Sequence, residues 1–417
     1  MRHDGTMDLR RRGTNLPKMG DFNRSVILEA IRRSRDGLSR TELVDATGLS
    51  AQTVTNITRR LLDDRFIEDA GRTIQGPGKP RTTLRLNATS RLSVGVHLDP
   101  AMMTFVLLDF TGAVIARSVR RTPAEDARRI IAAVAGAIDD LVGESNIDPE
   151  AIIGIGVATP GPLDAERGTV IDPPKLHSWH RVPLRDALAE AAGFRVTLEK
   201  DTTAAAVAEL WTGDHPPDGS FLFVYIGIGI GASLVIDGDV VRGASRNAGE
   251  VGHIVVDPAG PVCACGQRGC VEVVCTPQAI VERAEQAGVL ADDRVGSDAE
   301  SVDARFTELC DLAAGGDHDA SVVLEESMRH FAALISALTN MLDVDCVVLG
   351  GPFWSRVAPV YLAGLPGLLD QRSATRAVRG LPVSGTVVGD DVGAVGAGCV
   401  VLDEVMSPRA AALFLES

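Results

Sequence analysis

One His and three Cys lie close together in the sequence, at a spacing that suits a metal ion. His253, Cys263, Cys265 and Cys270 follow the pattern H-x9-C-x-C-x4-C. Zn²⁺ takes about four nitrogen and sulfur ligands in a tetrahedron, and a structural site fills all four positions. Glycines between the sulfurs allow a short loop to wrap the ion. The pattern therefore predicts a structural Zn²⁺ site; the alternative is buried thiols beside an unrelated His.

A second group of polar residues follows a turn that contains Gly48. Ser39 can cap the helix before this turn, and Ser50 can cap the helix after it. Two capped helices joined by a short glycine turn form a helix-turn-helix. Gln and Asn pair with base edges, Thr contacts a thymine methyl or a phosphate, and Arg contacts phosphates. A small helical subdomain with a solvated face is the alternative. The predicted DNA-binding residues of this helix are Ser50, Gln52, Thr53, Thr55, Asn56, Arg59 and Arg60.

Apolar spacing defines the other elements of this region. It predicts a disordered basic tail over residues 1–20, a first helix from Asp21, and a third helix that ends near Arg65. The predicted buried stripe of the third helix is Val54, Ile57, Leu61 and Leu62.

Two alternating segments, 66–68 and 83–86, predict the strands of a wing. The sequence between them, GPGKPR, is extended and cationic and cannot form a core. Lys79 and Arg81 are therefore predicted to contact DNA in a narrow minor groove, and a flexible linker is the alternative.

Composition and charge fit a DNA-binding protein with two or three domains. The chain has 417 residues, of which 45% are hydrophobic. Residues 1–90 hold 17 Lys and Arg against 11 Asp and Glu, whereas the remainder carries a net charge of −21. Nucleic acid is therefore expected at one end only.

The cysteine count and the apolar segments bear on the compartment. Seven Cys, three of them in the metal pattern, favour a reducing cytoplasm over a disulfide framework. No apolar run follows the basic start, so we predict no signal peptide. The longest apolar stretch, 221–236, is interrupted by glycines and is predicted to be two strands and a turn. We therefore expect a cytoplasmic protein without a membrane segment.

Strand-like and helix-like segments alternate from Leu92 onward. The predicted strands are 94–98, 104–109, a strand to Val119, 152–157, 195–198, 221–226, 232–236 and 346–349, and the predicted helices are 125–141, 202–210 and 320–341. This alternation is typical of an α/β protein with two lobes.

The segment GEVGHIVVDPAGPVCACGQRGCVE, residues 249–272, resembles the zinc signature of the ROK family of repressors, open reading frames and kinases. The resemblance runs from about Leu92 to about Val401. It implies an N-terminal winged helix-turn-helix followed by a two-lobed, actin-like, ribonuclease-H-type sugar-kinase fold. The implied domains are the winged helix over 21–90, a first lobe over 91–200, and a second lobe over 201–417, whose C-terminal helix can return to the first lobe.

The phosphate-binding parts depart from the kinases of this family. Where ROK kinases have Asp-x-Gly-Gly-Thr, this chain has HLDPA, residues 97–101, so His97 replaces the acid and Pro100 removes one donor N–H. The second loop, GIGIG over 227–231, has Ile228 in place of the usual Thr and is interpreted as a turn between strands. We therefore predict no catalytic residue and no enzyme activity, although Asp201 would be the general base of a kinase.

The sugar-binding parts are more complete. The resemblance implies that Asp201, Glu250 and Glu272 contact sugar hydroxyls, and that His253 stands at the pocket edge while it binds zinc. Lys175 and Lys200 replace two family Asn residues, which suggests the hypothesis of an anionic effector. The alternative is that these lysines point to solvent or pair with Glu199. The predicted ligand-binding residues are Lys175, Lys200, Asp201, Glu250, His253 and Glu272.

The favoured interpretation is a sugar-responsive transcriptional regulator, and a repressor more than an activator. Its expected partners are a double-stranded DNA operator with an inverted repeat, a sugar or sugar derivative, and further copies of itself in a dimer or tetramer. The long helix 320–341, or one of its neighbours, is a candidate for the dimer contact. A ROK sugar kinase fused to a DNA-binding domain is one alternative, and a scaffold without a ligand is another.

Overall fold

The computed structural model describes residues 16–34, 36–73, 81–123, 126–173, 179–213, 215–216, 218–291 and 298–406. The chain divides into two compact units. Unit 1 consists of residues 1–91, 109–111 and 402–417, and unit 2 consists of residues 92–108 and 112–401. Among the described residues, no helix is long and apolar enough to cross a membrane.

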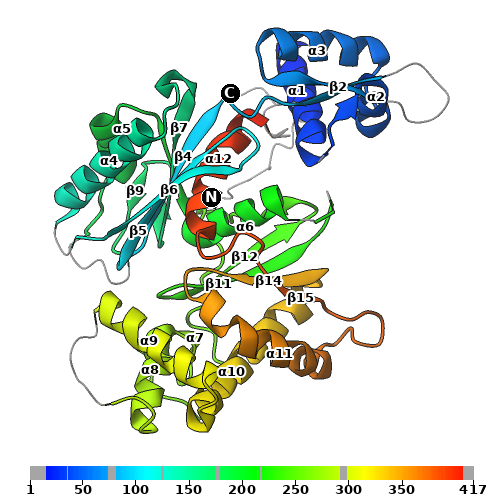
Figure 1. Ribbon diagram of the computed structural model, residues 1–417. Coiled ribbons are helices and arrows are strands. Elements are labelled where there is room, and N and C mark those ends of the chain that lie inside the picture. The colour runs from blue at the N-terminus through cyan, green and yellow to red at the C-terminus, as the bar shows by residue number, and fades with distance from the viewer. Residues whose placement is uncertain are drawn as a thin grey trace, which may run out of the picture. The chain divides into compact units, whose positions relative to one another are not determined.

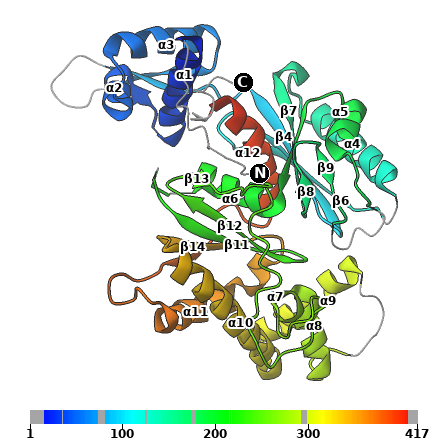
Figure 2. The ribbon, with the colours of Figure 1, turned by 180° about the vertical axis from the view of Figure 1, so that it is seen from behind.

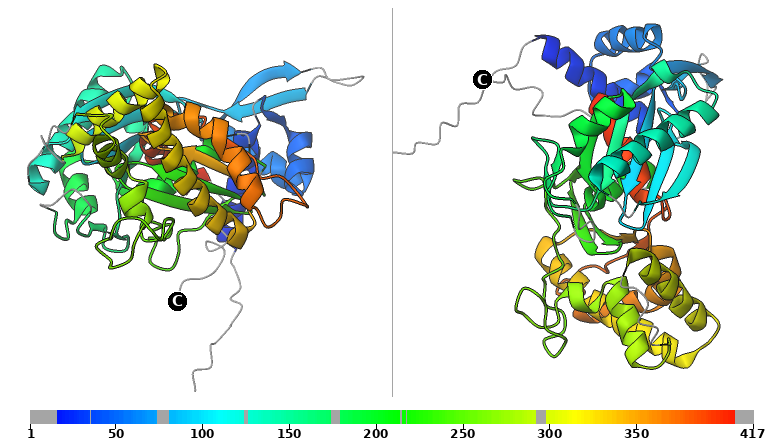
Figure 3. Two further views of the ribbon diagram at one scale, coloured as in Figure 1. Left: turned by 90° about the horizontal axis from the view of Figure 1, so that it is seen from below. Right: turned by 90° about the vertical axis from the view of Figure 1, so that its left-hand side faces the viewer.

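Unit 1 has the element order of a winged helix-turn-helix. Its three-stranded sheet has the order β1-β3-β2, and strands β2 and β3 extend from it as a two-stranded ribbon (Figure 3, left). The elements are α1 (Leu16–Arg33), β1 (Leu38–Ser39), α2 (Arg40–Thr47), α3 (Ala51–Asp63), β2 (Ile67–Thr73) and β3 (Arg81–Leu86).

Both predicted caps are present in unit 1. Ser39 and Glu42 form a capping box at the start of α2, and the Ser50 side chain accepts a hydrogen bond from the backbone N–H of Thr53 at the start of α3. Gly48 ends α2 in the left-handed conformation that favours glycine. These local signals fix the turn between the two helices.

Two details of unit 1 differ from the sequence predictions. Helix α1 begins at Leu16, so residues 16–20 are helical and not part of a disordered tail. Pro17 is compatible with this start, because the first turn of a helix needs no donor N–H there. In α3 the buried residues are Val54, Thr58 and Leu61. Thr58 is buried because its hydroxyl accepts a hydrogen bond from Arg40 Nε at 3.0 Å, while Ile57 and Leu62 are only half-buried.

Unit 2 contains two five-stranded sheets with the same topology. The first has the order β10-β7-β4-β5-β6 and the second β13-β12-β11-β14-β15. In each sheet three sequential antiparallel strands are extended by two strands parallel to the first. This repetition is the duplication expected of the actin-like fold. The strands are β4 (Leu92–Leu98), β5 (Met102–Leu108), β6 (Val114–Arg121), β7 (Ile152–Thr159), β10 (Val196–Lys200), β11 (Phe221–Ile226), β12 (Ile230–Ile236), β13 (Asp239–Val240), β14 (Cys346–Gly350) and β15 (Val383–Gly385), besides the short pair β8 (Leu163–Asp164) and β9 (Thr169–Val170).

Two helices lie between these sheets, α6 (Asp201–Thr212) and α12 (Val392–Met406) (Figures 1 and 2). Glycine makes the contact of α12 with the first sheet possible. A Cβ on Gly95 would lie 2.0 Å from the carbonyl oxygen of Ala394, and one on Gly156 would lie 1.8 Å from that of Ala397. Helix α12 thus packs on the first sheet, although it follows the second in sequence.

Each sheet has its own hydrophobic core. Helices α4 (Ala127–Glu144) and α5 (Leu184–Ala192) cover the first sheet, and helices α7–α11 cover the second (Figure 3, right). The apolar face of α10 (His318–Leu342) is buried in this second core. This stripe is therefore covered within the chain, whereas Val322 and Met341 of the same helix are exposed. A dimer contact through this helix or its neighbours stays a prediction. The other helices here are α7 (Val271–Val274), α8 (Pro277–Gln286), α9 (Ala299–Ala314) and α11 (Trp354–Arg372), and a short 3-10 helix η1 (Pro149–Ala151) precedes β7.

Candidate metal centre and ligand cleft

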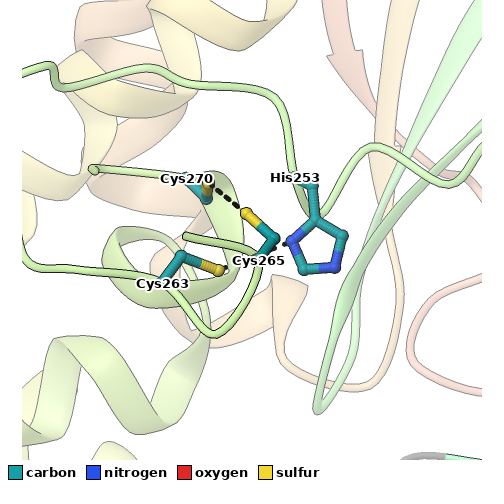
Figure 4. A group of neighbouring side chains, drawn as sticks. All are labelled: His253, Cys263, Cys265 and Cys270. Carbon is teal, nitrogen blue, oxygen red and sulfur yellow. Dashed lines mark hydrogen bonds between the residues drawn. The ribbon is translucent and has the colours of Figure 1, made fainter. Parts of the chain in front are cut away.

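The four predicted metal ligands converge in one place (Figure 4). Cys263 Sγ lies 3.5 Å from His253 Nδ1, and Cys265 Sγ lies 3.6 Å from Cys270 Sγ. All four donor atoms lie within 4.8 Å of one another. In a tetrahedral Zn²⁺ site, Zn–S bonds of about 2.3 Å place two sulfur atoms about 3.8 Å apart. The cluster can therefore hold a metal ion, and its donor set and spacing fit Zn²⁺.

Glycine and backbone hydrogen bonds shape the metal loop. Gly269 has a φ of 63°, and a Cβ there would lie 1.5 Å from the carbonyl oxygen of Asp257. The N–H groups of Val256 and Asp257 both donate to the Gly269 carbonyl. Burial raises the pKa of the Cys270 thiol to about 12, so a bound cation would have to displace its proton.

A cleft of about 410 Å³ lies between the two lobes of unit 2 beside this cluster. Five of the six predicted ligand-binding residues line it, and the sixth, Lys175, lies outside the described residues. The ends of β4 and β10, the β11–β12 hairpin and the metal loop each contribute to its wall. Its polar side chains are Asp99, Lys200, Asp201, Thr202, Tyr225, Glu250, His253, Glu272, Thr276 and Gln278.

Two carboxyl groups at the base of the cleft are buried. Burial raises the pKa of Asp201 to about 7 and that of Asp99 to about 6, and each carboxylate accepts a hydrogen bond from a backbone N–H, that of Thr202 at 2.7 Å and that of Ala101 at 2.9 Å. Lys200 opposes the rise at Asp201 by charge attraction. Near neutral pH, Asp201 can therefore donate or accept a hydrogen bond.

Asp201→Asn is expected to stabilise the protein more at pH 8 than at pH 4.5. The folded state retains the Asp201 proton between about pH 4 and pH 7, where the unfolded chain releases it, so this group lowers the free energy of unfolding as pH rises through that window. Ionisation of the buried Asp201 lowers the free energy of unfolding by at most about 4 kcal/mol above pH 7, and the Asn variant avoids this loss. Thermal melts of this variant and of the exposed control Asp139→Asn check the sign. Equal shifts at both pH values would contradict the account.

The positive charge of Lys200 is paired with a carboxylate of the protein itself. Its Nζ lies 2.6 Å from Glu250 Oε1 and donates to the carbonyl oxygen of Ala248 at 3.1 Å, and its side chain is 3% exposed. The other charged groups on the cleft wall include three further carboxyl groups. The sequence-based argument for an anionic effector therefore loses its support at Lys200, because the partner found there is Glu250.

The region that matches the first phosphate loop of the kinases contains a buried His–Tyr pair. His97 Nε2 lies 3.1 Å from the Tyr225 hydroxyl oxygen, and burial lowers the pKa of His97 to about 4. The imidazole is therefore neutral at physiological pH. The second glycine segment is the tight hairpin between β11 and β12 that we predicted, closed by a hydrogen bond from the Gly227 N–H to the Gly229 carbonyl.

The predicted DNA-binding residues of α3 form a largely exposed surface on unit 1. Gln52, Thr55, Arg59 and Arg60 are exposed, and Gln52 Nε2 donates to Asn56 Oδ1 at 3.1 Å. The hydroxyls of Ser50 and Thr53 are hydrogen-bonded to each other, so both help to cap the helix. Lys79 lies outside the described residues, as does the side chain of Arg81.

Sequence reasoning did not assign Tyr225, Thr276 or Gln278 to the cleft. Tyr225 lies near the end of the apolar strand β11, and the strand's position in the fold, beside β14, brings this end to the cleft. Thr276 caps α8, and Gln278 lies in the first turn of that helix. For Thr276 and Gln278, the available signal was their proximity to Glu272 in the sequence.

Comparisons with known proteins agree with these features. A duplicated five-stranded sheet, with a cleft between the lobes and a His/Cys cluster beside it, defines an actin-like fold of the sugar-kinase type. The model of the ROK family matches residues 93–404. This chain belongs to the ROK family.

Regulators and kinases both occur among its relatives. The chain is 25% identical over 390 residues to the xylose repressor of Caldicellulosiruptor bescii, which covers 93% of this chain and 96% of that protein. It is 28% identical to the glucokinase of Thermotoga maritima over 75% of this chain and 98% of the kinase. The crystal structure of a ROK family transcriptional regulator, described as a homolog of the E. coli MLC protein, aligns with a TM-score of 0.75, 23% identity, and 93% and 98% coverage.

Proposed function

We propose that this protein is a sugar-responsive transcriptional repressor of the ROK family, in which unit 1 binds DNA and the cleft of unit 2 binds the effector. The observation that carries the proposal is the extent of the two alignments. The repressor aligns with nearly the whole chain, whereas the glucokinase, aligned over almost its full length, covers only three quarters of it. The part by which the kinase is shorter is about the size of unit 1.

The surface of α3 supports DNA binding by unit 1. Its exposed Gln and Arg side chains offer the groups that read base edges and contact phosphates in a major groove. Two copies of the chain would place two such helices on the half-sites of an inverted repeat. We therefore propose a dimer or a dimer of dimers, acting in the cytoplasm on a double-stranded operator.

The metal ion is proposed to be structural Zn²⁺. His253, Cys263, Cys265 and Cys270 would fill its coordination shell, which leaves no position for a catalytic water. When bound, the ion cross-links the loop that carries Glu250 and His253, both of which line the cleft. The role proposed for zinc is thus to hold one wall of the effector site in place.

The effector is proposed to be a neutral sugar. Carboxylates accept hydrogen bonds from sugar hydroxyls, and the cleft presents Asp99, Asp201, Glu250 and Glu272 for this purpose. Because Lys200 is already paired with Glu250, an acidic sugar would add a negative charge to a site whose described lining residues hold no other Lys or Arg. Kinase activity is not proposed, since a neutral His97 stands where the kinases of the family have an acid.

Binding of a neutral aldose is expected to raise the melting temperature, and Glu272→Gln is expected to weaken that binding by about 10- to 100-fold, because a hydrogen bond to a charged group contributes about 1.5–3 kcal/mol. Titrations with xylose, glucose, N-acetylglucosamine and glucuronate measure the apparent Kd by thermal shift. Glu190→Gln, an exposed carboxylate on α5, is the matched control.

Two results of this experiment would count against the proposal. A shift with glucuronate alone would restore the anionic effector. Consumption of ATP in the presence of Mg²⁺ and a bound sugar would favour the kinase alternative.

A further inference from the structure

A cysteine, a histidine and a glutamate meet at the end of the second sheet away from the ligand cleft. Cys346 is the first residue of β14, and its direct neighbour on the parallel strand β11 is Phe221. Side chains of such neighbours emerge on the same face of a sheet. The ring of His215 stacks on that of Phe221, with centroids 4.5 Å apart and planes 20° apart. On this face, the His215 imidazole is hydrogen-bonded to the Cys346 side chain.

Glu209 orients this imidazole. Its Oε1 lies 3.1 Å from His215 Nε2, and its Oε2 accepts a hydrogen bond from the Thr386 hydroxyl at 2.6 Å. Glu209 is buried, with 2% of the residue exposed. A buried carboxylate with both oxygens engaged holds the ring in one orientation and favours its cationic form. The order nucleophile, imidazole, carboxylate is that of an activated thiol.

We propose that Cys346 is a modification site, a thiol activated by His215 and Glu209 that hydroperoxides oxidise to a sulfenic acid. The thiolate sulfur attacks the O–O bond, an S–O bond forms, and the sulfur loses two electrons. The leaving hydroxide, or the alkoxide of an organic hydroperoxide, takes the proton of the His215 imidazolium and departs as water or an alcohol. Hydrogen bonds to Cys346 and to Glu209 raise the pKa of His215 to about 9, so the proton is present at neutral pH.

Exposure separates Cys346 from the other cysteines outside the metal cluster. Cys346 is partly exposed, whereas Cys275, Cys310 and Cys399 are buried. Burial raises the pKa of Cys310 to about 12, which keeps that thiol protonated and unreactive. A small oxidant can therefore reach Cys346 in the folded protein while these three remain protected.

The test uses the full-length, zinc-loaded, reduced protein at pH 7. It is treated with a small excess of hydrogen peroxide in the presence of dimedone, and the label on each cysteine is followed by peptide mass spectrometry. Cys346 is expected to react at least about tenfold faster in the folded protein than in urea, because only the folded protein holds the His215 imidazolium where it can protonate the leaving group. His215→Asn is expected to remove most of this difference in rate between the folded and unfolded protein. The control is His180→Asn, which changes an exposed His outside the Cys346 site.

Two outcomes would overturn the proposal. In one, Cys346 reacts no faster in the folded wild-type protein than in the urea-unfolded chain. In the other, the rate is unchanged in a His215→Asn protein that melts cooperatively. If His215→Asn does not fold, the comparison of folded and unfolded wild type decides alone, and Glu209→Gln serves as the second variant.

Discussion

Alanine at both Gln52 and Asn56 is expected to weaken binding to the specific operator by about 100-fold or more, while binding to unrelated DNA changes little. Both side chains lie near the start of α3 and bond to each other at 3.1 Å, so both are placed to turn toward base edges. A paired contact to a base contributes about 1–3 kcal/mol of discrimination. Fluorescence anisotropy with operator and scrambled duplexes measures the ratio of the two affinities.

Arg59→Ala is the comparison that separates base reading from charge. It is expected to weaken binding to both duplexes alike and to lower the salt dependence by about one phosphate contact. Gln371→Ala, an exposed glutamine on α11, is the matched control. If the Gln52 and Asn56 variant lost affinity for both duplexes equally, α3 would not be the element that reads sequence.

Cys265→Ser is expected to lower the zinc content from one ion per chain to a small fraction and to reduce the melting temperature by several degrees. Cys265 is exposed yet supplies one of four converging donors, and a hydroxyl is a far weaker zinc ligand than a thiolate. Because we propose that the bound metal holds a wall of the cleft in place, the apparent Kd for the effector is expected to rise as well. Metal analysis, thermal melts and effector titration measure the three quantities.

The control for the zinc variant is Cys346→Ser, which changes a partly exposed cysteine at the other end of the second sheet. It is expected to retain one zinc ion and the affinity for the effector. Full zinc content in Cys265→Ser, or effector binding that does not change when the metal is removed by a chelator, would contradict the structural role.

Local signals explain what could be predicted from the sequence. The Ser39–Glu42 capping box involves residues three positions apart, and the four metal ligands fall within eighteen residues. Short loops bring such residues together whatever the rest of the chain does. The same is true of the β11–β12 hairpin, whose glycines mark the turn. These features needed no knowledge of distant contacts.

Long-range packing explains which features could not be predicted from the sequence. Helix α11 contains Pro359 and Pro366, which ordinarily argue against a helix. Helix α12 is rich in glycine, but Gly396 lies where a Cβ would be 1.8 Å from the carbonyl oxygen of Ala204. The pairing of Lys200 with Glu250 joins residues fifty positions apart, so the partner that the fold supplies could not be chosen from the sequence, which offered the adjacent Glu199 or solvent.

The geometry of unit 2 indicates how an effector could act. Asp201 begins α6, which lies between the two sheets, and Asp99 follows β4 of the first. A ligand that contacts both lobes binds one lobe angle more tightly than another, and its influence is limited to that difference in affinity. We therefore expect a sugar that bridges the cleft to release the protein from DNA.

The most direct test is binding of the purified protein to DNA fragments from around its own gene, with an unrelated fragment as control, over a series of salt concentrations. The account predicts that one fragment is bound specifically at moderate salt, and that a cleft-binding sugar reduces this binding. Equal binding to all fragments that disappears steeply with salt would reflect backbone electrostatics alone and would contradict the account.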